Sequence, residues 1–289
     1  MSDYIANAES ITEMTRLLEQ DRLMTRSVSG LLPPSVDPQT VHEVLDVGCG
    51  PGGWVREMAQ SYPSIHVTGI DTSSLVIDYA QQQVMVDQLT NAHFMVMDFQ
   101  QMDFPDASFD LVNARLVQWF LTENREAVVR EWFRVLRPGG VLRFTESEMS
   151  PITNSNVFEQ HNVKFITALE RMGKTISPGG YHTGVILLLR PMLELLGCEQ
   201  IQETAHLFNF SAGMPGREIF VQDVIKGMQT MGQVMVKMKV IGKTELARLQ
   251  EQTRTDMYAP GFWGILFFVS AWGRKPLISD GASWRDSNE

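Results

Sequence analysis

The sequence predicts an α/β protein with a mostly parallel sheet, crossover helices and an added helical cap. Between residues 44 and 146, short β-branched runs alternate with stretches whose apolar residues recur at three-and-four spacing, as in βαβ units. Turn-forming residues stand where the strands should end. A chain of 289 residues, 44% of them hydrophobic, is also long enough to bury a large core.

The elements of this core follow one another in strand–helix order. The expected strands are rich in β-branched and aromatic residues and are Val44–Val47, His66–Ile70, Ala92–Val96, Phe109–Asn113 and Val141–Glu146. The expected helices each have an apolar face and are Trp54–Ser61, Ser74–Leu89 and Arg125–Leu136. Turns are predicted at Pro51-Gly52-Gly53, at Asn91 and at Arg137-Pro138-Gly139-Gly140.

Helical patterns also flank the core. Before it, Ile5–Leu32 is expected to form one or two helices that end at Pro33-Pro34. The later segments are expected in this order: helices over Ser150–Leu196 with a break at 177–180, a strand at Glu199–Phe210, helices over Arg217–Thr255, a final strand at Gly264–Gly273, and a disordered polar tail over Ser279–Glu289.

Charge and composition exclude several classes of protein. The 24 basic and 34 acidic residues give a net charge of −10, which disfavours a protein that wraps nucleic acid. Cys49 and Cys198 are too few for a disulfide framework, and no signal peptide or apolar run of roughly 20 residues is recognised. A soluble cytoplasmic protein, monomeric or homodimeric, is expected, and no clustered His, Cys or carboxylate pattern predicts a metal site.

The first strand leads into the glycine-rich sequence Leu45-Asp46-Val47-Gly48-Cys49-Gly50-Pro51-Gly52-Gly53-Trp54. Such a loop lets the backbone approach a ligand at the N-terminus of the next helix. Gly48, Gly50 and Gly53 also satisfy the dinucleotide pattern GxGxxG, which on its own is a weak signal. Asp46 decides between a dinucleotide and a ligand with an amino-acid end. Its carboxylate would repel the diphosphate of a dinucleotide and suits the cationic end of an amino acid.

At this point the sequence resembles the class I S-adenosylmethionine-dependent methyltransferases, whose first motif is acid-x-Gly-x-Gly-x-Gly. The matching residues here are Asp46, Gly48, Gly50 and Gly52. Further family features follow in order: Asp71, nineteen residues after Gly52, then Phe94–Phe99, Phe104–Val112 and Val135–Leu142. The ending Phe267–Pro276 is similar to the closing strand of small-molecule members related to ubiquinone and sterol methyltransferases.

The resemblance implies a Rossmann-like sheet of seven strands whose last strand inserts antiparallel between the fifth and sixth. It divides the chain into an N-terminal helical lid (1–40), a core that binds S-adenosylmethionine (41–149), helical cap or substrate insertions (150–198 and 213–258), the last two core strands (199–212 and 262–276) and a disordered tail (277–289).

The resemblance also implies which residues bind the cofactor, S-adenosylmethionine. Asp71 would accept the ribose hydroxyls, Asp98 the exocyclic amine of adenine, and Phe99 would offer its backbone amide to the ring. The cofactor-binding candidates are Asp46, Gly48, Cys49, Gly50, Gly52, Asp71, Thr72, Asp98, Phe99, Arg115 and Gln118. The alternatives are a turn cap for Asp98, a surface ion pair for Arg115 and ordinary helix packing for Gln118.

Methyl transfer is an in-line displacement that needs close, collinear positioning and a dry site, and a base only when the acceptor loses a proton. The catalytic candidates are Glu146, His161 and His182. Glu146 has the alternative of pairing with Arg143 or with solvent, and each histidine that of a structural hydrogen bond. The candidates for binding substrate are Tyr4, Trp119 and Tyr181.

The predicted reaction is methyl transfer to a small hydrophobic metabolite, with an oxygen, nitrogen or carbon acceptor. The methionines of Val221–Ile241 either pack on the core or form an adaptable wall for that substrate. The alternatives are an NAD(P)-dependent oxidoreductase and a non-catalytic protein that binds S-adenosylmethionine. Nucleic-acid methylation is disfavoured because Asn113-Ala114-Arg115 lacks an Asn/Asp-Pro-Pro-aromatic motif.

Overall fold

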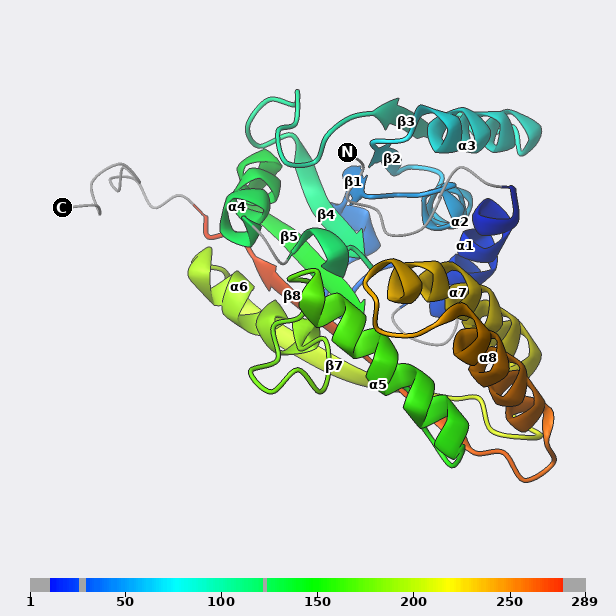
Figure 1. Cartoon of the computed structure of the whole chain (residues 1–289). Helices are drawn as coiled ribbons and strands as arrows, with labels where there is room; N and C mark the ends of the chain where they lie inside the picture. The colour runs from blue at the N-terminus through cyan, green and yellow to red at the C-terminus, as the bar shows by residue number, and fades with distance from the viewer. Residues whose placement is uncertain (1–10, 26–29, 122–123, 278–289) are drawn as a thin grey trace.

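The computed structural model describes residues 11–25, 30–121 and 124–277 (Figure 1). Five parallel strands form the main body of the sheet: β1 (Glu43–Val47), β2 (His66–Asp71), β3 (Ala92–Val96), β4 (Phe109–Arg115) and β5 (Leu136–Ser147). Their order is β3-β2-β1-β4-β5, so the chain leaves β1 in one direction for β2 and β3 and returns across it for β4. This reversal beside β1 is where open α/β sheets bind ligands.

The closing strand β8 (Gly264–Arg274) inserts antiparallel between β5 and β7 (Glu199–Asn209), as the family resemblance implies. A short strand, β6 (Ile152–Thr153), pairs with the start of β8 and raises the number of strands in the sheet to eight, one more than expected. Residues 137–140, which were expected to form a turn, belong to β5 instead. A register shift between Phe109 and Leu111 and the positive φ of Gly139, 77°, accommodate these residues there.

Helices cover both faces of the sheet because alternate strand residues are apolar on each face. On one face, α2 (Gly53–Ser61) and α3 (Ser74–Val86) pack on a cluster that includes Val44, Val67 and Leu111. On the other face, α4 (Arg125–Val135) and α6 (Leu189–Leu195) pack on a cluster that includes Leu45 and Val112. The core is thus a three-layer α/β/α arrangement.

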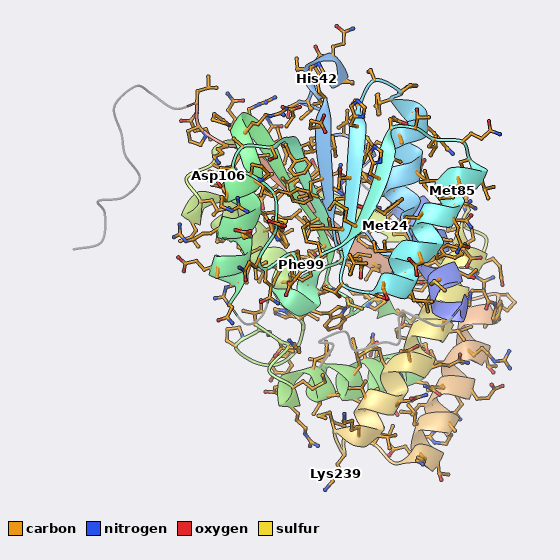
Figure 2. The ribbon with its side chains drawn as sticks, turned by 90° about the horizontal axis from the view of Figure 1, so that it is seen from above. Met24, His42, Met85, Phe99, Asp106 and Lys239 are labelled. Carbon is orange, nitrogen blue, oxygen red and sulfur yellow. The ribbon has the colours of Figure 1, made fainter. Side chains whose placement is uncertain are left out.

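The remaining helices form a separate layer beyond the carboxyl ends of the parallel strands. These are α1 (Ile11–Met24), α5 (Asn156–Arg171), α7 (Arg217–Lys237) and α8 (Lys243–Tyr258), and α7 contacts the other three. Figure 2 shows His42, just before β1, at the end of the sheet far from this layer, and Phe99 at the end next to it. Within the described ranges, no helix combines the length and the apolar character of a transmembrane span.

Candidate active site

A cavity of about 780 Å³ lies between the carboxyl ends of the strands and the helical layer. The loop after β1, the ends of β2 and β4 and the segment after β3 form one side of it. Helices α1, α5 and α7 form the other side. Of the candidates named from the sequence, the cavity is lined by Gly48, Cys49, Gly50, Asp71, Thr72, Asp98, Phe99, Arg115, Gln118, Trp119 and His161.

The glycine loop is held in a conformation that favours glycine. Gly48, Gly50 and Gly52 have φ of 66°, 53° and 78°. A Cβ on Gly52 would lie 2.3 Å from the Phe94 ring, whereas a Cβ on Gly50 would enter open space. Gly52 therefore serves close packing behind the loop and does not line the cavity, while Gly50 leaves room for a ligand in front of it.

Asp71 ends β2 and faces the same part of the cavity. One carboxylate oxygen accepts the Gly50 amide at 3.1 Å and the other the Ser73 amide at 3.0 Å. Burial raises its pKa, and the amides of Ser73, Gly50 and Thr72 oppose that shift. These bonds fix the carboxylate and leave it with lone-pair capacity to accept from a ligand hydroxyl.

Asp98 and Phe99 follow β3 and line the cavity beside Asp71. Asp98 is exposed, and its side chain accepts the Gln100 amide at 2.8 Å, which holds the turn in place. The Phe99 carbonyl accepts the Trp132 indole N–H at 3.0 Å, and the two rings meet edge to face. The segment is thus anchored from behind by α4.

Asp46 lies behind the glycine loop and does not line the cavity. Only 4% of the residue is exposed, and its carboxylate accepts the Asn113 side-chain amide at 2.7 Å. Burial raises the pKa of Asp46 to about 7, against the opposing effects of Arg115 and Asn113. The carboxylate thus pairs with the neighbouring strand β4, and its direct contact with a cationic ligand stays a prediction.

A carboxylate that the sequence analysis missed, Asp21 of α1, lines the cavity instead. It accepts the backbone amides of Gly53 and Trp54 at the start of α2 and pairs with the Arg115 guanidinium at 2.8 Å. Arg115 also donates to the Thr25 hydroxyl at 3.3 Å and lies over the Trp54 ring. Arg115 thus makes a buried ion pair rather than a surface one. No sequence motif around Asp21 predicted this pair.

Glu146 is fully buried and does not line the cavity. One oxygen accepts the Val117 amide at 2.8 Å and the Gln118 amide also donates to the carboxylate, while Oε2 has no partner in the part of the chain that is described. Burial raises its pKa to about 8. Glu146 contacts neither Arg143 nor solvent, the two alternatives considered. Its hydrogen bonds to the Val117 and Gln118 amides fix the loop after β4, which places Gln118 in the cavity wall.

His161 of α5 lines the cavity, whereas the other proposed histidine does not. His161 is 3% exposed, and both ring nitrogens lack a partner among the described residues. Burial lowers its pKa to about 4. The side chain of His182 is 39% exposed, with Nδ1 3.9 Å from Glu148, and Tyr181 is 85% exposed. The structure does not bring these two residues to the cavity, and Tyr4 lies outside the described residues.

The half of the cavity between α5 and α7 is apolar. Its wall consists of Met149, Phe158, Phe165, Phe220, Val224, Met228, Met231, Leu266 and Phe268, next to Trp119. Of the four methionines that suggested an adaptable wall, Met228 and Met231 line the cavity, while Met235 is fully buried in packing between α5, α7 and α8. The methionines of α7 thus contribute both to packing between helices and to the wall of the cavity.

Comparison with known proteins identifies the domain. Residues 44–140 match the family described as "Methyltransferase domain". A sterol 24-C-methyltransferase of Neurospora crassa is 37% identical over 123 residues, which are 42% of this chain and 32% of that protein. A malonyl-[acyl-carrier protein] O-methyltransferase of Enterobacter lignolyticus is 34% identical over 128 residues, which are 44% of this chain and 47% of that protein. The matches span less than half the length of these curated relatives.

Among solved structures, phosphoethanolamine N-methyltransferase 2 of Haemonchus contortus in complex with S-adenosyl-L-methionine aligns with a TM-score of 0.53. The alignment is 17% identical and covers 92% of this chain and 57% of that one, so it supports the fold. The open space in front of Gly50, the fixed Asp71 carboxylate and the Oε1 of Gln118, which has no partner among the described residues, fit a polar nucleoside ligand. Residues 44–140 therefore resemble a methyltransferase domain, and the chain has the fold of a solved methyltransferase.

Proposed function

We propose that the protein transfers a methyl group from S-adenosylmethionine to a small, mostly apolar molecule. The observation that carries this proposal is one continuous cavity. Its strand side has the polar groups of a nucleoside site, and its helical side is lined by aromatic and methionine side chains. The matched family is a methyltransferase family, which favours this reaction over the NAD(P)-dependent alternative.

S-adenosylmethionine, when bound, supplies an electrophilic methyl group on a positively charged sulfur. The residues of this chain would hold it as follows: Asp71 accepts the ribose hydroxyls, the Asp98–Phe99 segment receives adenine, and Gly48–Gly50 and Gln118 contact the amino-acid portion. Asp46 supports the loop through Asn113 rather than by contact. Helix α1 acts as the lid, because it contributes Arg16, Leu17, Gln20 and Asp21 to the wall.

The apolar chamber would orient the acceptor and exclude water, which strengthens electrostatic interactions in the site. The cations in the wall are already neutralised: Arg16 pairs with Asp223 at 2.7 Å and Arg115 with Asp21 at 2.8 Å. Among the cavity-lining residues that the structure describes, a substrate with a phosphate or carboxylate would find no uncompensated cation. This supports an uncharged acceptor.

Calorimetric titration with S-adenosylhomocysteine tests the cofactor assignment. We expect Asp71→Asn to weaken binding roughly 10- to 100-fold, because hydrogen bonds to a charged group contribute about 1.5–3 kcal/mol. Asp78→Asn is the matched control, since Asp78 is an exposed residue of α3 that does not line the cavity. Binding of NAD but not of S-adenosylhomocysteine would refute the proposal, as would equal binding by the wild type and Asp71→Asn.

We further propose that the protein acts in the cytoplasm on a small molecule, as a monomer or homodimer. Both Cys49 and Cys198 are free thiols, which suits a reducing compartment. Light scattering at micromolar concentration measures the oligomeric state.

A further inference from the structure

The buried imidazole of His161 is the polar group in the cavity wall that most needs an explanation. Its two nitrogens have no hydrogen-bond partner among the residues described, although the side chain is almost completely enclosed. An unpaired polar group in such a place destabilises the fold. Nearly all buried polar groups in native proteins have a hydrogen-bond partner, so the lack of one at His161 calls for an explanation.

The surroundings of His161 indicate the chemistry of that partner. Phe158 and Phe165, three residues before and four residues after it, lie on the same face of α5 and line the cavity with it. Burial is the only cause of its lowered pKa, so no nearby charge acts on the ring. At neutral pH His161 is therefore uncharged and has one nitrogen that accepts a hydrogen bond.

The other polar side chains on this side of the cavity are engaged within the protein. The Asn162 amide donates to the Pro151 carbonyl at 3.3 Å, and the Thr230 hydroxyl to the Lys226 carbonyl at 3.2 Å. Among the described residues, the carboxylates that the helices contribute to the wall, Asp223 and Asp21, are both ion-paired, so this side of the cavity offers no uncompensated carboxylate to an ammonium group. An ammonium or phosphate group would thus enter without a counter-charge, whereas a hydroxyl group finds an acceptor in His161.

We propose that His161 is a catalytic base that accepts the proton of a hydroxyl group on an uncharged, apolar substrate, so that the reaction is an O-methylation. This rests on the proposed methyltransferase function. The hydroxyl oxygen forms a bond to the methyl carbon as the carbon–sulfur bond breaks. The electron pair of that bond stays on sulfur, and the hydroxyl proton passes to the imidazole. The positive charge lost at sulfur reappears on His161, so the dry cavity holds one positive charge before and after the transfer.

Two substitutions separate this role from a structural one. His161→Phe keeps a ring of similar size without nitrogens, and His161→Gln keeps a hydrogen-bonding group that cannot take the proton. His42→Gln is the control, because the side chain of His42 is 68% exposed at the opposite end of the sheet. We expect all three variants to bind S-adenosylhomocysteine within about twofold of the wild type. We expect His161→Phe to melt no lower than the wild type, whereas a structural histidine would lower the melting temperature.

The activity assay uses tritiated S-adenosylmethionine and the neutral, organic-soluble extract of the organism that carries this gene. We expect methyl transfer to fall at least 100-fold in both His161 variants, as is typical of a lost general base, and to be unchanged in His42→Gln. Hydriodic acid cleaves O-methyl groups to volatile methyl iodide under conditions that leave C-methyl groups intact. We expect the label to be released by this treatment.

The outcomes distinguish the two proposals. If the wild type does not bind S-adenosylhomocysteine, the methyltransferase function itself fails. The His161 proposal alone is overturned if the cofactor binds but the label enters a charged fraction, stays bound to carbon or nitrogen, or enters no extract component. It is also overturned if His161→Phe retains the wild-type rate or loses stability together with activity.

Discussion

The buried carboxyl group of Glu146 makes the stability of this protein depend on pH in a direction opposite to that of an ordinary salt-bridged acid. Burial raises its pKa from 4.5 to about 8. Between these values the folded state binds the proton and the unfolded state does not. The free energy of unfolding therefore falls as the pH rises through this window. Glu146→Gln removes the titration, and its side-chain oxygen can still accept the Val117 and Gln118 amides.

The size of the effect follows from the shift. One pKa unit corresponds to about 1.4 kcal/mol, so the full penalty at high pH is about 5 kcal/mol. Between pH 6 and pH 8 the contribution of Glu146 falls by about 2 kcal/mol. Glu146→Gln should accordingly be more stable than the wild type. Its advantage should grow by about 2 kcal/mol over this interval.

Urea unfolding at pH 6, 7 and 8, followed by far-ultraviolet circular dichroism, measures the difference. Glu159→Gln is the control, because Glu159 is an exposed residue of α5. Its difference from the wild type should stay constant with pH. Stability curves for the wild type and Glu146→Gln that run parallel from pH 6 to pH 8 would show that Glu146 does not titrate in this window. The account of its burial would then be wrong.

Three further predictions concern the loop, the lid and the base. Gly52→Ala should destabilise the fold by about 2–4 kcal/mol in urea unfolding, because the new Cβ meets Phe94 and φ is 78°; a double variant with Phe94→Leu should recover part of the loss. Asp21→Asn should cost about 2 kcal/mol by the same measurement, because the buried Arg115 guanidinium loses its counter-charge. For His161, whose pKa falls from 6.5 to about 4 on folding, the unfolded state binds more protons between these values. The wild type should lose up to about 3 kcal/mol as the pH drops through that window, and His161→Phe should not.

Local sequence patterns predicted the parallel core well. The strands were placed within a few residues because alternation and turn residues act over short distances. One exception is the start of β5 at Leu136, where a bulge carries the chain through the expected turn. The closing strand β8 was also predicted from the local pattern, while its antiparallel insertion came from the family resemblance; both are confirmed. The two-residue strand β6 left no signal, because it forms only where the start of β8 extends past β5.

The site was predicted less completely because it depends on contacts between distant segments. Asp21 reaches Arg115 across 94 positions of the chain, and Arg16 reaches Asp223 across 207. No periodicity in α1 indicates which of its polar residues faces the cavity. The same limit explains Tyr181 and His182, which precede η4 (Val185–Leu188) and do not line the cavity. Nothing in the local sequence separates His161 from His182. Only the tertiary structure places His161 in the cavity wall and His182 outside it.

The position of β8 has a consequence for how the molecule is made. Among the described residues, the strand that joins β5 to β7 is the last one in sequence, although it lies inside the sheet. During translation, β7 leaves the ribosome before β8, the strand with which it pairs, has been made. The first five strands can associate during translation, but the sheet is completed only when residues 264–274 have emerged. Termination of translation before residue 264 would leave β7 without the strand with which it pairs.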